Sequence, residues 1–156
     1  MRLAIRYLII VVLFAGLASG QAAKTADARR QAILDYQLTL PRANQLIAAL
    51  DAMSKYVVTL PDYADRLRKA AQMTPAEQMA QLDKDPKAAE ILKRNQLTSR
   101  DYLVGVPTLR MALLAASGAP AGPTIIASPA NVAFAKANLS VLKPKMDAAD
   151  GAGARR

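Results

Sequence analysis

Five side chains in the second half of the chain have the types and spacing of a ligand-binding site. They are Tyr102, Arg110, Asn131, Phe134 and Asn138. Arg110 is the single charged residue between residues 102 and 114, and a guanidinium in such an apolar segment needs an acceptor, such as the carboxylate or phosphate of a ligand. The two asparagines are seven residues apart, so they share one helix face with Phe134. We therefore expect a polar-edged pocket between the two helices that carry these residues.

Structural roles are the alternative for the same residues. Arg110 can reach water at the edge of a helical bundle, or it can bond to an Asp or to carbonyls at a helix end. Asn131 can assist the first turn of its helix, and Asn138 can bond to neighbouring backbone. Both the binding role and the structural role stay open at this point.

The composition lacks the side chains that most catalytic sites use. The chain of 156 residues has no His, Cys or Trp, so the usual zinc ligands and the thiol and imidazole groups are missing. The sequence also has no glycine-rich phosphate loop and no metal-ligand spacing. We expect a protein that is not an enzyme and that uses no metal or cofactor.

Tyrosine and aspartate are the remaining acid–base candidates. The tyrosines concerned are Tyr36, Tyr56, Tyr63 and Tyr102. They are amphipathic side chains, and packing alone explains them. The aspartate pairs, Asp62 with Asp65 and Asp83 with Asp85, lie in loops or first turns, where capping and the helix dipole explain them. A small hydrolase that uses Asp and Tyr is the weaker alternative.

The N-terminus has the order of a secretory signal peptide. Arg2 and Arg6 precede an apolar run over residues 7–17, and small residues follow. A membrane-spanning helix needs about 20 apolar residues, so this shorter run predicts a cleaved signal peptide over residues 1–20, with a retained anchor as the alternative. Cleavage lowers the formal net charge from +9 to +7 because it removes the two arginines. We expect a periplasmic or secreted protein with no nucleic-acid partner.

Signals for the first turn of a helix recur along the rest of the chain. Each is a Ser, Thr or Asp followed by Pro or by an acidic residue that completes the cap. These signals begin at Thr39, Thr59, Thr74, Asp85, Thr98 and Ser128. The apolar spacing behind them is helical, as with Leu46, Leu50 and Met53 at successive turns, and no window shows the alternation of a strand.

The predicted fold class is all-α. We expect a compact bundle of about five to seven helices of mixed length over residues 21–146, following the cleaved signal peptide. Only 4% of the residues are aromatic and Ala is abundant, which predicts that small residues pack the helices together. Residues 147–156, rich in Ala and Gly, are expected to form a disordered C-terminal tail.

The segment 99–117 is apolar around nearly its whole circumference, which predicts a central, buried helix. Gly105 and Pro107 predict a bend within it, and Gly118 predicts its C-terminal cap. A loop rich in Pro and Gly follows. The last helix begins at Pro129, runs to about residue 142, and either continues or kinks at Pro144.

Two resemblances accompany these observations. Residues 97–102 with Gly105 downstream, residues 131–134 with Asn138, and residues 36–39 resemble small exported helical proteins of Gram-negative bacteria that have no assigned function. This resemblance covers most of the mature chain and implies a periplasmic or secreted helical domain, without an activity. Met73-Thr74-Pro75-Ala76-Glu77-Gln78 is more weakly similar to periplasmic chaperones of the LTxxQ type.

The sequence thus predicts a non-enzymatic binding or interaction protein of the cell envelope. Its partner is expected to be an envelope protein or an anionic ligand, and the protein itself a monomer or weak oligomer. Chaperone or envelope-stress activity is an alternative that the second resemblance suggests. Weak contact with the membrane surface is another, because a basic protein is attracted to anionic lipid head groups.

Overall fold

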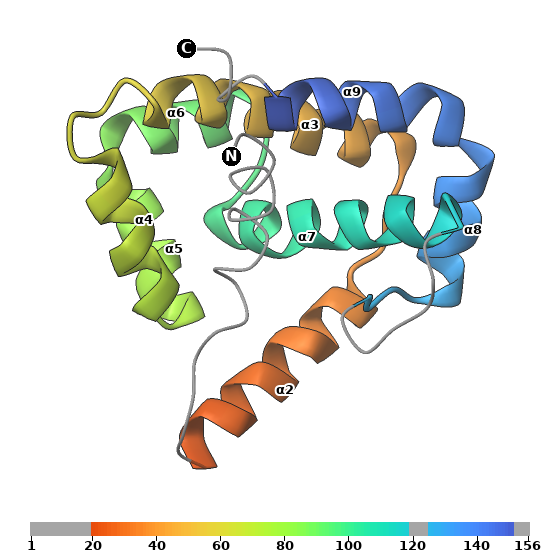
Figure 1. The fold of residues 1–156 in the computed structure, drawn as a ribbon, viewed down its shortest axis with the longest axis horizontal. Helices are drawn as coiled ribbons and strands as arrows, with labels where there is room; N and C mark the ends of the chain where they lie inside the picture. Colours follow the sequence, from red (N-terminus) through yellow and green to blue (C-terminus); the bar gives the residue numbers. More distant parts are fainter. Residues whose placement is uncertain (1–19, 119–124, 152–156) are drawn as a thin grey trace, which may run out of the picture.

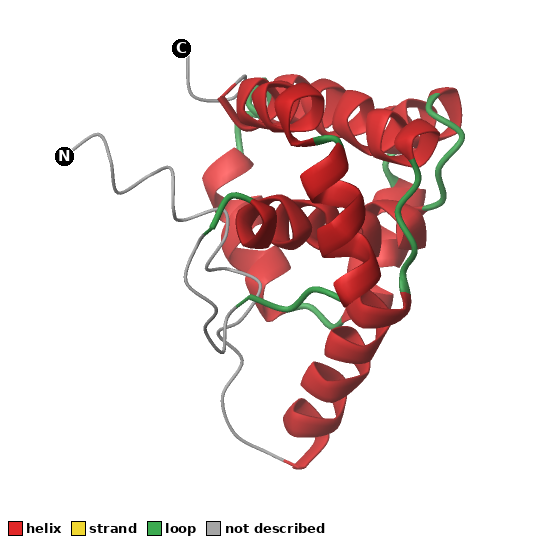
Figure 2. Cartoon of the chain, turned by 90° about the vertical axis from the view of Figure 1, so that its right-hand side faces the viewer, coloured by secondary structure: helices red, strands yellow, loops and turns green. Residues whose placement is uncertain are grey.

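All regular structure in the described part of the chain is helical, as predicted. The computed structural model describes residues 20–118 and 125–151, and within these ranges it contains no strand and eight helices, one more than the upper end of the predicted range. Figure 2 shows the helices and the short loops that join them. No helix in these ranges is long and apolar enough to cross a membrane. Almost all of the predicted signal peptide lies outside the described residues.

The helices have the following bounds in chain order: α2 Gly20–Asp35, α3 Leu40–Val57, α4 Tyr63–Gln72, α5 Pro75–Lys84, α6 Pro86–Arg94, α7 Ser99–Ala116, α8 Pro129–Ala137 and α9 Leu139–Gly151. Five of the six predicted start signals supply a side chain that accepts a hydrogen bond from the first turn. The exception is α4, whose N-cap residue, Asp62, makes no such bond. Thr74 with Glu77 and Thr98 with Asp101 each form a reciprocal capping box.

Helix α7 lies at the centre of the fold, as its apolar circumference predicts. It packs against α2, α3, α5 and α8. In Figure 1, α3 and α9 run side by side along one flank of α7, α8 lies at one end, and α4 and α5 lie at the other. Leu109 and Ala112 of α7 are completely buried, whereas Leu114 is 39% exposed.

Small residues allow the helices to approach closely, since the distance between two packed helices depends on the side chains at their contact. The alanines that are completely buried are Ala43, Ala49, Ala112 and Ala135, which belong to α3, α7 and α8. The larger side chains Leu46, Leu109 and Leu142 fill the space between them and are also completely buried. Low aromatic content and abundant Ala therefore do indicate this mode of packing.

Gly105 marks a very close approach between α7 and its neighbours. A Cβ atom at this position would lie 2.8 Å from both terminal methyl groups of Leu46 and 2.9 Å from the hydroxyl of Tyr36. Helix α7 runs through Gly105 and Pro107 without interruption. The hydroxyl of Thr108 donates a hydrogen bond of 2.7 Å to the carbonyl of Val104, one turn earlier in the helix.

The C-terminal part of the chain differs from the expectation in two ways. The last helix breaks at Asn138 rather than at Pro144. The side-chain Nδ2 of Asn138 donates a hydrogen bond to the carbonyl of Phe134, and the backbone carbonyl of Asn138 accepts hydrogen bonds from the N–H groups of Val141 and Leu142 in the first turn of α9. Pro144 lies within α9. That helix also continues to Gly151, so residues 147–151 do not belong to a disordered tail. Ala149 is 2% exposed, and its burial against the bundle explains why these residues form a helix.

The C-terminus of α6 has a cap that the sequence did not suggest. The N–H of Leu97 bonds to the carbonyl of Leu92, and the N–H of Gln96 bonds to the carbonyl of Lys93, which is the Schellman pattern. Gln96 has φ 56°, in the left-handed region that glycine usually occupies at this position. Gly118 has φ 80° after α7 and confirms the predicted glycine cap there.

Replacing Gln96 with glycine is expected to raise the free energy of unfolding by about 0.5–1 kcal/mol. The left-handed conformation costs a residue with a Cβ atom about 1–2 kcal/mol, and the extra freedom of glycine in the unfolded chain offsets about 0.5–1 kcal/mol of that gain. Urea denaturation of Gln96→Gly measures the change. Gln96→Ala is the matched control, because it loses the same side chain but keeps the strain. Equal stability of the two variants would contradict the prediction.

Candidate functional site

Asn131 is placed between two segments of backbone, where both ends of its amide are used. Its Oδ1 accepts a hydrogen bond from the N–H of Leu38 at 3.0 Å, and its Nδ2 donates to the carbonyl of Tyr36 at 2.7 Å. The side chain is 2% exposed. It fastens α8 to the linker between α2 and α3, and its amide is therefore not available to a ligand from solution.

Phe134 and Asn138 also have internal roles. Phe134 packs against the hydrophobic core. The Asn138 Nδ2 donates to the carbonyl of Phe134 at 2.9 Å, which is the local backbone bond that was the structural alternative for this residue. Because the helix ends at Ala137, the two asparagines do not continue on one straight helix face.

Arg110 extends from α7 to α9 and forms an ion pair with Asp150, which is again one of the structural alternatives. The arginine side chain is 11% exposed, and its Nε has no hydrogen-bond partner among the described residues. Tyr102 lies close to this pair. Burial raises the pKa of the Tyr102 hydroxyl, the positive charge of Arg110 opposes that shift, and Asp150 adds to it. The pair holds the end of α9 on the central helix.

The aspartates considered as acid–base candidates cap and connect helices. Asp85 accepts bonds from the N–H groups of Lys87 and Ala88 at 3.0 and 3.1 Å, and from the hydroxyl of Tyr56 at 2.9 Å. Burial and this bond raise the pKa of Tyr56. Asp83 accepts a bond from the hydroxyl of Ser99. Capping and helix-to-helix contact account for both carboxylates.

Tyr36 contributes a hydroxyl to the packed region beside Gly105. Burial raises the pKa of Tyr36 to about 12, and the nearby Asp101 carboxylate adds to the shift while Arg42 opposes it. The hydroxyl lies near Asp101 without the geometry of a good hydrogen bond, and it has no partner among the described residues. A tyrosine with so high a pKa is a poor base at neutral pH.

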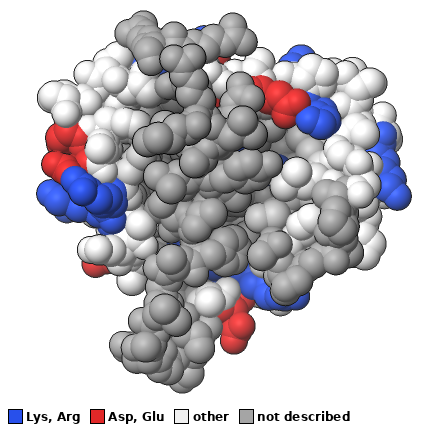
Figure 3. Space-filling view, in the orientation of Figure 1, with Lys and Arg blue, Asp and Glu red and all other residues white. Residues whose placement is uncertain are grey.

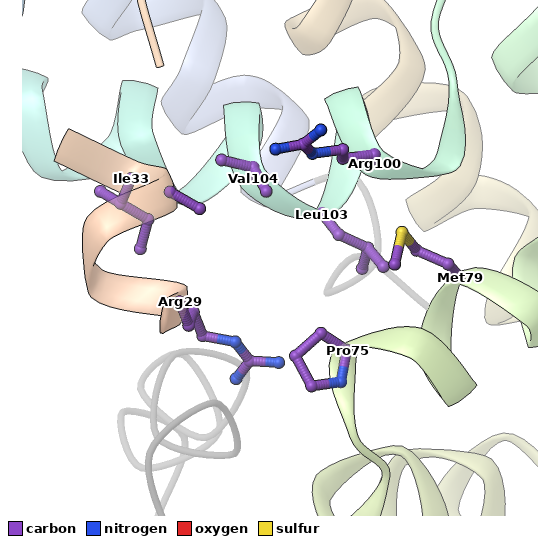
Figure 4. A pocket seen from close by; sticks show the side chains of 8 residues that line it. Arg29, Ile33, Pro75, Met79, Arg100, Leu103 and Val104 are labelled. Atoms are coloured by element: carbon purple, nitrogen blue, oxygen red, sulfur yellow. The ribbon is translucent and has the colours of Figure 1, made fainter. Parts of the chain in front are cut away.

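A cavity of about 130 Å³ lies between α2, α5 and α7 (Figure 4). The residues that line it are Arg29, Ala32, Ile33, Pro75, Met79, Arg100, Leu103 and Val104. Six of these eight residues are apolar, and none is acidic. Apolar walls with a small number of charged groups are typical of small-molecule binding sites.

The two arginines lie on different edges of this cavity. Figure 4 shows Arg29 reaching from α2 toward Pro75, and the side chain of Arg100 running along α7 toward Val104. Arg29 Nη2 donates to Oε1 of Gln78 at 3.1 Å, and the Gln78 amide donates to the carbonyl of Ala70 at 2.8 Å. This chain of bonds fixes the position of Arg29 at the edge of the cavity. Burial lowers the pKa of Arg29 from its ordinary value.

None of the residues that line the cavity was among the five predicted from the sequence. Ile33 and Leu103 have the pattern of ordinary core residues, and Arg29 and Arg100 have that of ordinary surface charges. Only the packing of three helices that are distant in the sequence brings them together. A partial signal was present at residues 73–78, where Pro75 lines the cavity and Gln78 holds Arg29.

Charged side chains also occur across one face of the described part of the molecule. On the face shown in Figure 3, Lys and Arg side chains form separate groups, most of them beside acidic side chains, rather than one continuous patch. Within residues 20–118 and 125–151, no group of three acidic side chains is arranged to hold a metal ion. Comparison of the chain with protein-family models, curated proteins and solved structures found no match.

Proposed function

We propose that the protein is a non-enzymatic binding protein of the Gram-negative cell envelope, exported to the periplasm or beyond, and that its ligand enters the cavity between α2, α5 and α7. The observation that carries this proposal is an apolar cavity of about 130 Å³ with an arginine on each of two edges. The N-terminal signal-peptide pattern supports the location.

The chemistry of the lining favours binding over catalysis. Its side chains supply shape, apolar contact and positive charge. Arginine keeps its proton in proteins, so neither Arg29 nor Arg100 is suited to act as a general acid or base. None of the tyrosines and aspartates that were acid–base candidates lines this cavity. Asp83 and Asp85 are engaged in helix caps or in bonds between helices.

The walls of the cavity differ in how firmly they are held. Ile33 of α2 is buried, and α7 is the central helix of the bundle. Helix α5, by contrast, contributes Pro75 and Met79 but has no buried residue. Methionine is unbranched and adapts to irregular shapes. The α5 wall is therefore the one that can adjust to a ligand.

The volume limits the ligand to a small apolar group. An apolar cavity of about 150 Å³ in another protein takes up benzene, so a cavity of this size accepts about one aromatic ring or a branched chain of similar volume. A larger ligand would extend beyond this volume.

Fluorine NMR on the purified full chain tests the proposal with three small fluorinated compounds: fluorobenzene, 4-fluorobenzamide and 4-fluorobenzoate. At least one is expected to bind with saturation, and Ala32→Leu is expected to weaken that binding at least ten-fold. The added methyl groups would occupy the cavity from the α2 wall, because Ala32 is one of its lining residues.

Ala28→Leu is the matched control. Ala28 lies one turn earlier on the same helix and is exposed, so the same change there is expected to leave binding unaltered. If none of the three compounds binds, or if Ala32→Leu binds them as well as the unmodified protein does, the ligand site is not this cavity.

A further inference from the structure

Helices α4 and α5 form a hairpin whose two ends are attached to the rest of the fold in different ways. In Figure 1 the hairpin extends away from α6, and the turn that joins α4 to α5 lies at its far end. We call the end beside α6 the base; it contains Asp62 at the start of α4 and residues 82–85 at the end of α5. We call residues 73–79 at the far end the tip. Pro75 and Met79 of the tip form the α5 wall of the cavity.

Side-chain bonds to three other helices hold the base. The Asp85 carboxylate caps α6 and accepts a hydrogen bond of 2.9 Å from the hydroxyl of Tyr56 in α3. Arg66 of α4 also lies beside this carboxylate, with 3.8 Å between Nη1 and Oδ2. The hydroxyl of Ser99 at the start of α7 donates a hydrogen bond to the carboxylate of Asp83. The base is therefore tied to α3, α6 and α7 at once.

Little apolar surface holds the hairpin beyond its base. Neither α4 nor α5 has a buried residue. Among the residues of these two helices, Leu82 is the one that packs against the hydrophobic core, and it belongs to the base. Toward the tip, Pro75 and Met79 line the cavity. A segment with few buried apolar contacts separates from the fold at a lower free energy than the core does.

Gln78 holds the tip against α2. Its Oε1 accepts a hydrogen bond of 3.1 Å from Nη2 of Arg29, and its Nε2 donates one of 2.8 Å to the carbonyl of Ala70 in α4. The first bond joins the hairpin to α2, and Figure 4 shows Arg29 reaching toward Pro75 at this point. The second bond joins α5 to α4, so we expect the two helices to move together. Gln78 itself does not line the cavity.

We propose that the α4–α5 hairpin is a lid of the cavity. It rotates about its base, and Gln78 holds its tip in the closed position. Rotation moves Pro75 and Met79 away from the other two walls, and the ligand enters between the tip and α2. The chain connections permit this motion, because α5 joins α6 through the single residue Asp85 and α4 follows a turn at residues 58–62. The entry of a ligand rests on the proposed function, whereas the rotation can be measured without a ligand.

Distances between pairs of spin labels, measured by electron paramagnetic resonance on the purified full chain, test the rotation. The sequence contains no Cys, so substituted cysteines are the sole attachment sites. The first label is attached to Ala48→Cys in α3. The second is attached to Ala76→Cys at the tip, to Lys84→Cys at the base or to Ala28→Cys in α2. All four positions are exposed.

The label at Ala76 is expected to give two distances from Ala48, with a minor open population in the otherwise unmodified protein. Gln78→Ala is expected to raise that population about five-fold, since it removes a hydrogen bond that only the closed position makes. The labels at Lys84 and Ala28 are each expected to keep a single distance. A single distance for Ala76 in the Gln78→Ala background, or a second distance for Lys84 or Ala28, would overturn the lid.

Gln81→Ala is the matched control for Gln78→Ala. Gln81 is an exposed glutamine of the same helix and does not line the cavity. Its substitution is expected to leave the open population unchanged. Equal open populations in the two variants would show that Gln78 does not hold the tip, and this result would also overturn the proposal.

Exchange rates from fluorine NMR test whether the lid admits the ligand. For a fluorinated compound that binds, Gln78→Ala is expected to raise the association rate and the dissociation rate by the same factor, about five-fold. The Kd is expected to stay unchanged, because Gln78 is not part of the lining. Gln81→Ala is expected to leave both rates as they are.

The outcomes separate this inference from the proposed function. If a compound binds but Gln78→Ala leaves both rates unchanged, the hairpin is not the route of entry, and the lid is wrong while the cavity is still the binding site. If none of the three compounds binds, the proposed function fails, and the role of the hairpin as a lid fails with it even where the label distances show the rotation.

Discussion

Asn131→Ala is expected to lower the free energy of unfolding by about 2–4 kcal/mol. The substitution removes the partner of the Leu38 N–H and that of the Tyr36 carbonyl in one step. Each hydrogen-bonding group that stays buried without a partner costs about 1–3 kcal/mol. The carbonyl of Tyr36 is expected to cost less than the N–H of Leu38, because Tyr36 is only half-buried and water can reach it more easily. Urea denaturation measures the loss, and amide hydrogen exchange at Leu38 is expected to become faster.

Asn138→Ala provides the matched control for this prediction. The same substitution seven residues later removes a single bond, from Nδ2 to the carbonyl of Phe134, at a half-buried position. Its expected cost is below about 1 kcal/mol, since water can replace the lost donor. Similar costs for the two variants would show that Asn131 does not fasten α8 to the linker between α2 and α3.

Gly105→Ala is expected to destabilise the fold by about 1–3 kcal/mol, although alanine is the better helix former by up to about 1 kcal/mol. The added Cβ would lie 2.8 Å from both terminal methyl groups of Leu46, which is completely buried and has little room to move. It would also lie 2.9 Å from the hydroxyl of Tyr36. Thermal and urea denaturation measure the effect.

A double-mutant cycle with Tyr36→Phe identifies the cause. Tyr36→Phe removes a buried hydroxyl that has no hydrogen-bond partner among the described residues, so by itself it is expected to change stability little. In the background of this substitution one of the close contacts is absent, and Gly105→Ala should then cost less. An unchanged cost in that background, or a stabilising effect of Gly105→Ala alone, would contradict the close approach of α7 to Tyr36 and α3.

The positions of helix starts could be read from the sequence because capping is local. Thr74 and Glu77 are three residues apart, and the bonds between them depend on no other part of the chain. The central position of α7 was also predictable, since a helix that is apolar on nearly all sides must be covered on nearly all sides. The cap at Gln96 was missed because glycine is the usual signal for that conformation.

The roles of the five predicted site residues depended on contacts between distant segments. Arg110 and Asn131 stand out in the sequence as polar groups in apolar surroundings, and the structure buries Asn131 and leaves the Arg110 side chain only 11% exposed. Their partners, however, are Asp150 in α9 and the backbone around Leu38, which no local pattern can specify. A buried polar group signals that a partner exists but not whether that partner is internal or a ligand.

By itself, the sequence determined the helical class, most of the helix boundaries and the identity of the central helix, because these follow from bonds and periodicity within a few residues. Only the tertiary structure decided where the last helix breaks, how far α9 extends and where the cavity lies. The cavity walls come from α2, α5 and α7, and a void between helices depends on how all three pack together. Residues such as Arg29 and Arg100 acquire a shared environment only through that packing.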